Sequence, residues 1–255
     1  MAPEFWKKKR SKDSKGGRAN KRQNTGPGPS HTLSPWSQCL TIDYLHAHGR
    51  PRNYTISVAI PGSILKNSLT QELKTILVGQ IARSLALFQV DEIVVFMDTG
   101  SEQAGDHEKG PSAFFSRLLQ YAEAPPHLRK KLFPMHHDLK FAGLLPTLDA
   151  PHHMRRDDRS LYREGVVTDR PAQSGKCYVD IGLGTDVLID HALRPGVRVT
   201  VEVHYASATG HGPPIPARAE AVSPSAPREL HGLYWGYQTR LARSLGEVFT
   251  GCPFT

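Results

Sequence analysis

Two short apolar segments, one on each side of a stretch with helical spacing, constrain the fold of this chain more than any other feature. Residues 54–60 (YTISVAI) and 91–97 (DEIVVFM) are nearly continuous in apolar side chains, which is typical of strands that are buried on both faces. Between them, seven apolar residues recur at helical spacing: Leu69, Leu73, Ile76, Leu77, Ile81, Leu85 and Phe88. Ser68 and Gln71 have the spacing of a capping box, which predicts that the helix starts there. A strand, a helix and a strand of these lengths predict a right-handed crossover onto a parallel sheet.

The hydrophobic period changes to two in the second half of the chain. Four valines alternate with polar residues, as in a half-buried antiparallel strand: Val197, Val199, Val201 and Val203. Further short strands are predicted between turns rich in Pro and Gly, at residues 165–169, 177–181, 187–189 and 217–222. Together they have the size of a small OB-like β-barrel. Helical spacing then returns and predicts a helix over residues 234–249.

These changes of period predict an α/β fold in which a barrel interrupts a parallel sheet. We predict a basic, disordered arm over residues 1–50, followed by the first part of the α/β domain over residues 51–162. The inserted OB-like β-barrel occupies residues 163–222, and the α/β domain resumes over residues 223–255.

Positive charge is concentrated at the N-terminus of this chain, whose net charge is +8. Residues 1–22 contain nine Lys or Arg against two acidic residues, so seven of the eight excess charges lie there. The run KKKRSK at residues 7–12 is compatible with a nuclear address, with an arm that contacts nucleic acid, or with a solvated tail.

Cysteine usage and hydropathy indicate an intracellular protein that does not enter the membrane. The three cysteines are widely spaced and odd in number, which argues against a disulfide framework and against a structural zinc site. No apolar stretch is long enough to span a bilayer, and the N-terminus lacks the pattern of a signal peptide.

Two segments resemble sites of catalysis or metal binding, but their context favours other structures. His152 and His153 are adjacent and point in different directions, without HExxH or CxxC spacing, so we predict no metal site. Residues 179–184 (VDIGLG) resemble a cofactor loop, but no helix has room to follow them, and a hairpin turn is favoured. No Ser or Cys has the context of a catalytic nucleophile, and catalytic residues stay unassigned.

A cluster of basic residues is the best candidate for a binding site. Guanidinium and ammonium groups pair with phosphate oxygens, and the neighbouring barrel favours RNA as the partner. The residues predicted to contact RNA are Arg129, Lys130, Lys131, His152, Arg155 and Arg163, with Arg156 and Arg159 in the same cluster. The alternative is a salt network between domains, formed with Asp149, Asp157 and Asp158. Trp235 and Tyr237 are predicted to pack in the core.

Five segments between residues 52 and 255 together resemble a known family. In order they are YTISVAIPGSIL, GQIARSLALFQVDEIVVF, LRKKLFPMHHDLKFAGLLPTLDAPHHMR, YREGVVTDRP and GLYWGYQTRLA. They are similar to the eukaryotic SPOUT-class RNA methyltransferases, a centromere-associated group linked to uridine-N3 methylation of large-subunit ribosomal RNA.

This resemblance implies an α/β-knot fold, with an OB-like domain inserted between Arg163 and Ser223, and a homodimer in the full-length family. It implies S-adenosyl-L-methionine as the methyl donor for a uridine of structured RNA, in the nucleus or nucleolus and at the spindle or centromere in mitosis. The protein would orient the base, assist removal of its proton and exclude water.

The chain departs from the family at its C-terminal end. Family members continue past the position of Thr255 into the segments that bind the cofactor, so the resemblance implies a truncated chain with no cofactor-binding residue of its own. The alternative function is a non-catalytic RNA-binding or scaffold protein, associated with the spindle or centromere, that uses only the arm and the barrel.

Overall fold

A three-stranded parallel sheet forms the first part of the fold, as the two apolar segments predict. Its strands are β1 (Ser57–Pro61), β2 (Glu92–Phe96) and β8 (Gln238–Ala242), in the order β1-β2-β8. Val95 of β2 lies between Ile60 and Leu241 in the parallel register. As the central strand, β2 is buried along most of its length, and its sequence is accordingly a continuous apolar run.

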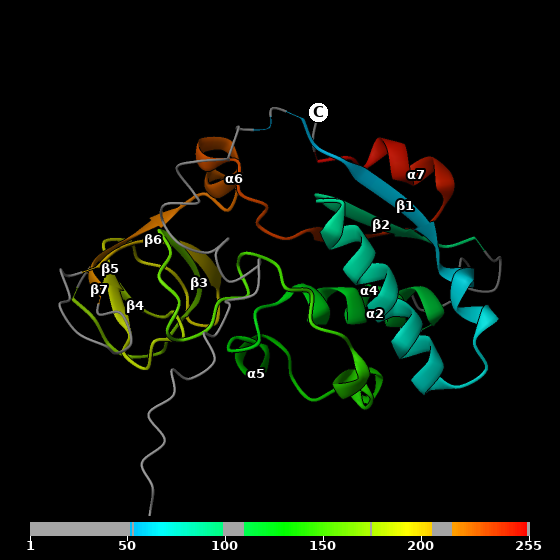
Figure 1. Cartoon of the computed structure of the whole chain (residues 1–255), viewed down its shortest axis with the longest axis horizontal. Coiled ribbons are helices and arrows are strands. Elements are labelled where there is room, and N and C mark those ends of the chain that lie inside the picture. The colour runs from blue at the N-terminus through cyan, green and yellow to red at the C-terminus, as the bar shows by residue number, and fades with distance from the viewer. Residues whose placement is uncertain (1–51, 53, 99–109, 174, 206–215, 254–255) are drawn as a thin grey trace, which may run out of the picture. The chain divides into compact units, whose positions relative to one another are not determined.

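The computed structural model describes residues 52, 54–98, 110–173, 175–205 and 216–253 (Figure 1). All of them belong to one compact unit, Ser34–Thr255. The arm predicted over residues 1–50 lies outside the described residues. In the ranges above, no helix combines the length and the apolar character needed to cross a membrane.

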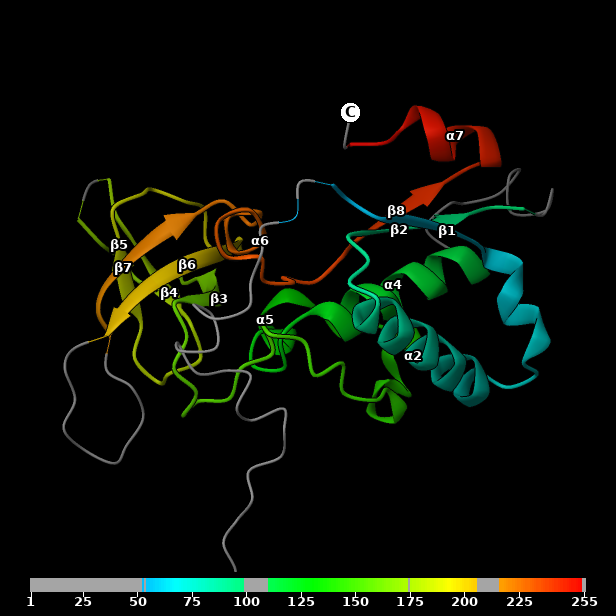
Figure 2. The same cartoon turned by 45° about the horizontal axis from the view of Figure 1, so that its top comes forward.

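Two long helices cover one face of the parallel sheet, and a short helix lies against the other. Figure 2 shows α2 (Gln71–Leu87) and α4 (Pro111–Glu123) below the sheet and α7 (Leu245–Thr250) above it. Two successive right-handed crossovers in one direction place their helices on the same face. The core between them includes Phe115 and Leu118, which are fully buried.

The buried face of α2 is not the one that the helical spacing predicts. Its fully buried residues are mostly small: Thr75, Val78, Gly79, Ala82 and Ala86. Leu69, Leu73 and Phe88 of the predicted stripe are exposed, so that part of the prediction was wrong. A Cβ atom at Gly79 would lie 2.4 Å from Pro146 Cδ, so close approach of the backbone decides which face of α2 packs.

The start of α2 also differs from the predicted capping box. Thr70 is the N-cap residue, and its hydroxyl accepts a hydrogen bond from the Leu73 amide at 3.3 Å. The helix therefore starts two residues later than the Ser68 cap predicts. Four short helices complete this half of the described chain: η2 (Gly62–Asn67), α5 (Arg129–Leu132), η3 (His137–Leu139) and η4 (Ala142–Leu144).

The period-two segments form an antiparallel sheet that is nearly closed into a barrel, as the alternation predicts. Its strands are β3 (Tyr162–Val167), β4 (Cys177–Asp180), β5 (Val187–Ile189), β6 (Arg198–Tyr205) and β7 (Pro216–Val222). The order is β5-β4-β3-β6-β7, and β5 and β7 approach each other at the seam. Val179, Ile189 and Val201 are among the side chains that fill its interior.

The chain returns to the parallel sheet after β7, but not as the single helix predicted over residues 234–249. A short helix, α6 (Ala226–His231), leads into β8, and α7 follows. Gly236, with φ of +88°, interrupts a helical path. The open edge of β2 then captures residues 238–242 as a strand, and Arg240 Nε donates to Glu92 Oε1 at 2.8 Å. Pairing with β2 thus makes residues 238–242 a strand, although their apolar spacing favours a helix.

Candidate nucleic-acid interface

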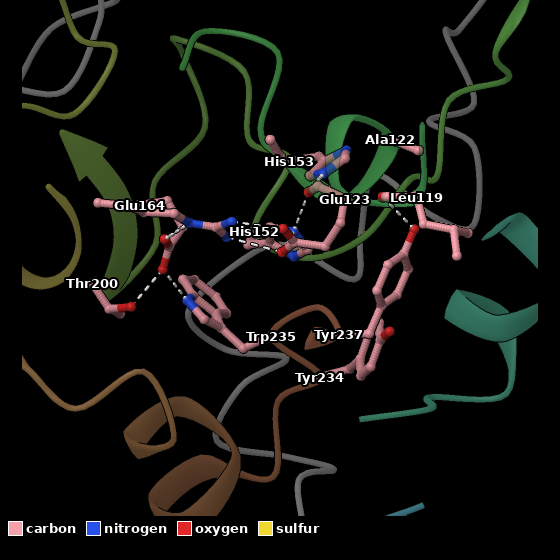
Figure 3. A network of polar contacts seen from close by, with 12 residues as sticks. Leu119, Ala122, Glu123, His152, His153, Glu164, Thr200, Tyr234, Trp235 and Tyr237 are labelled. Atoms are coloured by element: carbon pink, nitrogen blue, oxygen red, sulfur yellow. Dashed lines mark hydrogen bonds and ion pairs between the residues drawn. The ribbon is translucent and has the colours of Figure 1, made fainter. Parts of the chain in front are cut away.

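A network of charged and polar groups joins the parallel-sheet half to the barrel-like sheet (Figure 3). Arg198 of β6 contacts both halves, and its side chain is 29% exposed. Two of its nitrogens, Nη1 and Nη2, donate to the carboxylate of Glu123, at the end of α4, at 2.6 and 2.9 Å. Its Nε donates to Glu164 Oε2 of β3 at 2.5 Å. One guanidinium therefore neutralises a carboxylate from each half of the molecule.

Glu164 receives two more hydrogen bonds inside the junction. The Thr200 hydroxyl and the Trp235 indole N–H each donate to Glu164 Oε1 at 2.5 Å. Trp235 is buried, and Tyr237 is buried with its hydroxyl donating to Leu119 O at 2.9 Å, so both pack in the core as predicted.

The carboxylate of Glu123 is held in its charged form. Burial alone would raise its pKa, but hydrogen bonds from His152 and Arg198, and the charge of Arg198, outweigh burial and lower the pKa to about 2. Glu123 is therefore ionised across the physiological pH range.

Both histidines of the pair at residues 152–153 bind the end of α4. His152 Nε2 lies 2.9 Å from the Glu123 carbonyl oxygen and 3.0 Å from Glu123 Oε1, and His153 Nε2 lies 2.5 Å from the same carbonyl. Burial, followed by the neighbouring His152, lowers the pKa of His153 to about 3, so this ring is neutral. Among the described residues, no group of three or more His, Cys, Asp or Glu side chains could hold a metal ion.

Arg163, one of the predicted RNA contacts, lies inside the protein. Its Nη2 donates to Arg155 O at 2.9 Å and to Asp158 O, and its Nε donates to the Tyr205 hydroxyl at 3.2 Å. The side chain is only 2% exposed. It therefore holds the turn at residues 155–158 against the barrel-like sheet, and His152 is similarly buried beneath the surface.

Three of the predicted contacts lie at the surface. Lys130 and Arg155 are exposed, and Lys131 Nζ is exposed while pairing with Asp180 of β4 at 2.6 Å. Arg129 is half-buried, because its Nε and Nη2 donate to the carbonyl oxygens of residues 124 and 122 at 3.0 and 3.1 Å. The exposed members are therefore the ones available for phosphate.

The alternative salt network with Asp149, Asp157 and Asp158 is not formed within the described residues. Asp158 instead accepts a hydrogen bond from the backbone N–H of Arg155 at 2.7 Å. The ion pairs that join the two halves involve Glu123, Arg198 and Lys131. Sequence reasoning missed Glu123, Glu164 and Arg198, because the paired residues are 34 and 75 positions apart and share no motif.

The glycine-containing segment at residues 179–184 forms the predicted turn. Asp180 Oδ1 accepts a hydrogen bond from the Gly182 amide at 2.9 Å, and Gly182 has φ of +79°. A Cβ atom at Gly182 would lie 2.7 Å from the His127 ring. Arg156 Nε donates to Leu183 O at 3.3 Å. The turn is therefore a contact between the two halves and is covered by protein side chains.

Comparison with known proteins identifies the family. The model of the family described as "Putative RNA methyltransferase" matches residues 55–255. The chain belongs to this family. Human and mouse proteins named 28S rRNA (uridine-N(3))-methyltransferase are 49% and 48% identical to it over 218 and 219 residues. A Drosophila melanogaster protein of the same name is 42% identical over 225 residues.

The match covers most of this chain and a smaller part of each relative. It includes 80%, 81% and 82% of this chain for the human, mouse and fly proteins. The corresponding shares of those proteins are 56%, 54% and 46%. The chain thus spans about half the length of the curated relatives that it matches.

Proposed function

We propose that the protein takes part in S-adenosyl-L-methionine-dependent methylation of uridine N3 in large-subunit ribosomal RNA. The family match over residues 55–255 carries this proposal, together with the names of the human, mouse and fly relatives. The parallel sheet interrupted by a barrel-like sheet supports an α/β-knot fold with an inserted OB-like domain at residues 163–222.

Two positions among the described residues were candidates for the methyl donor, and neither fits it. The turn at residues 179–184 has the sequence that most resembles a cofactor-binding loop. The His127 ring and the Arg156 guanidinium pack against this turn, and no helix follows it. At the carboxyl end of β2, Asp98 accepts hydrogen bonds from the backbone N–H and the hydroxyl of Ser63. We therefore propose that S-adenosyl-L-methionine binds residues outside the described ranges, and we assign no catalytic residue.

The contribution proposed for this part of the protein is to bind and orient RNA. Lys130, Lys131 and Arg155 are exposed cations, and they supply phosphate contacts that position RNA without reading its sequence. Arg129, His152 and Arg163 support this surface from below, because their hydrogen bonds fix the end of α4 and the turn at residues 155–158. A homodimer in the nucleus or nucleolus, with spindle or centromere association in mitosis, is part of the same proposal.

Mass spectrometry of large-subunit RNA from cells that lack the gene tests the proposal. We expect N3-methyluridine to disappear from one position and to return when the gene is restored. If N3-methyluridine is unchanged while the protein still binds RNA, the non-catalytic RNA-binding or scaffold function replaces this one.

A further inference from the structure

A stacked pair of side chains, Arg170 and Tyr178, lies on the outer face of the barrel-like sheet. Along β4, Cys177 and Val179 point into the barrel, whereas Tyr178 and Asp180 are partly exposed on the outside. The Arg170 Cζ atom lies 4.0 Å above the centre of the Tyr178 ring, which is close to van der Waals contact. Arg170 itself is exposed. The guanidinium group therefore lies against the ring.

The backbone fixes the position of this pair. Thr168 N and Thr168 Oγ1 both donate to Tyr178 O, at 2.8 and 3.2 Å, just after the end of β3. Arg170 follows two residues later, so the chain delivers its side chain above the ring. Leu188 of β5 pairs with Tyr178 across the sheet and is 39% exposed, which extends the surface with an apolar neighbour.

Two carboxylates near this pair are already paired with cations, whereas Asp169, beside Arg170 in the chain, is exposed. Asp180, on the same outer face of β4, is already paired with Lys131 at 2.6 Å. Asp190, just after β5, is paired with Lys176 at 2.7 Å. Among the described residues, Arg170 makes no hydrogen bond or ion pair, so its charge stays available. The surface also continues toward Lys131, one of the phosphate contacts proposed above.

A second Arg–Tyr contact in the protein shows what distinguishes this one. The Arg129 Cζ atom lies 4.9 Å from the centre of the Tyr121 ring, but Arg129 donates to the carbonyl oxygens of residues 122 and 124 and is half-buried. That contact is structural. Arg170 has no comparable bonds within the described residues, and its outer face is open.

We propose that the outer face of the Arg170 guanidinium, held flat by the Tyr178 ring, stacks under an unpaired base of RNA. Aromatic rings and guanidinium planes are the groups on which proteins stack unpaired bases. This inference rests on the proposed function, because it names the part of the RNA that the barrel-like sheet binds, a single-stranded segment.

Binding of two oligomers by the 255-residue chain tests this assignment. One is single-stranded oligouridine, and the other is an abasic strand of the same length, with the same phosphates but no bases. Fluorescence anisotropy gives the preference for the strand with bases. We expect Tyr178→Ala and Arg170→Lys to reduce this preference by roughly 5-fold or more, since an ammonium group keeps the charge but has no plane. Tyr178→Phe keeps the ring, and we expect it to keep the preference.

Phe249→Ala, which removes an aromatic side chain 76% exposed on α7, is the matched control and should leave the preference unchanged. Equal preferences in wild type, Tyr178→Ala and Arg170→Lys would overturn the stacking assignment while leaving RNA binding intact. If the wild-type chain binds neither strand and no rRNA hairpin, the stacking assignment and the RNA-binding part of the proposed function fall together. Circular dichroism of each variant confirms that a lost preference does not come from unfolding.

Discussion

Arg155 and Arg163 are eight residues apart, yet their side chains have opposite environments. The Arg155 side chain is exposed and makes no hydrogen bond or ion pair within the described residues, whereas Arg163 is buried beneath it and donates to Arg155 O. The same residue type in the same basic run therefore has two roles. Arg155 is placed to pair with a phosphate and release a counterion from RNA. Arg163 instead holds the backbone segment that carries Arg155.

Replacing these arginines separately tests the two roles. We expect Arg155→Ala to weaken binding to an rRNA hairpin and to reduce the slope of log K against log salt by about 1. Arg163→Ala removes the hydrogen bonds to the carbonyl oxygens of Arg155 and Asp158, and we expect it to lower the free energy of unfolding by about 2 kcal/mol. Salt titrations and urea unfolding measure the two effects. An exposed arginine elsewhere, Arg243, is the control for Arg155, and an equal loss of slope in Arg243→Ala would contradict a local contact.

The carboxylate of Glu123 gives stability a dependence on pH. Its pKa is about 2 in the folded protein and 4.5 as a free side chain, so its ionised form stabilises the fold. That contribution is complete above a pH of about 4.5 and is lost as the pH falls toward 2. We expect Glu123→Gln to be less stable than wild type at neutral pH and the difference to shrink through this window.

Urea unfolding of both proteins at a series of pH values measures that difference. Glu123 is among the groups that act on the lowered pKa of His153, so the measured difference also contains any change in the protonation of His153. A difference that stays constant between neutral pH and a pH of about 3 would show that the Glu123 charge does not stabilise the fold.

The elements show how far the sequence determines this fold. The strands β4 and β5 alternate between buried and more exposed residues, as a period of two predicts, whereas β3 is buried along its whole length. The helix predicted over residues 234–249 is wrong because its pattern says nothing about the free edge of β2, which captures residues 238–242. A local hydrophobic pattern indicates which side of an element is buried. It does not indicate which distant strand the element will pair with.

The surface part of the candidate site could be predicted from the sequence, and its buried part could not. The sequence identified the basic run, and the exposed positions of Lys130, Lys131 and Arg155 agree with a surface role. It could not show that Arg163 and His152 are buried, because their partners lie in other segments of the chain. RNA contact by all six residues stays a prediction.

The turn between β4 and β5 provides a test at the scale of elements. Gly182 and Gly196 have nearly the same φ, +79° and +82°, but only a side chain at Gly182 would meet the His127 ring. We expect Gly196→Ala to lower the free energy of unfolding by about 1 kcal/mol, because alanine is strained at this positive φ. Gly182→Ala should cost more, because the contact between the two halves must also shift. Equal losses in thermal unfolding would show that the turn does not depend on this contact.

The whole molecule depends on the junction around Arg198, which connects carboxylates of α4 and β3. Because both carboxylates are buried, removing the guanidinium leaves them without the cation that they share, although His152 still contacts Glu123 and Thr200 and Trp235 still donate to Glu164. We expect Arg198→Met to lower the free energy of unfolding by about 3 kcal/mol. We also expect the wild-type chain to unfold as one unit and this variant to lose that coupling. Hydrogen exchange followed by mass spectrometry tests this coupling. We expect the free energies of opening for amides in β2 and in β6 to be equal in wild type and unequal in Arg198→Met.

The exposed pair Arg218–Glu220 is the matched control for Arg198. Its side chains are 71% and 49% exposed, and we expect Arg218→Ala to change the free energy of unfolding by about 0.5 kcal/mol or less. Unequal exchange of β2 and β6 in the wild-type chain would mean that the junction does not couple the two halves.

The pairing of β8 with β2 also has a consequence for the order of folding. Arg240 and Glu92 are 148 positions apart in the chain, and closing so long a loop is entropically unfavourable and slow. The barrel-like sheet, residues 162–222, lies within this interval, and its antiparallel neighbours are mostly close in sequence. If that sheet collapses first, the ends of its strands bring residues 238–242 near β2 and shorten the remaining search. The barrel-like sheet then serves as the folding nucleus on which the last parallel strand depends.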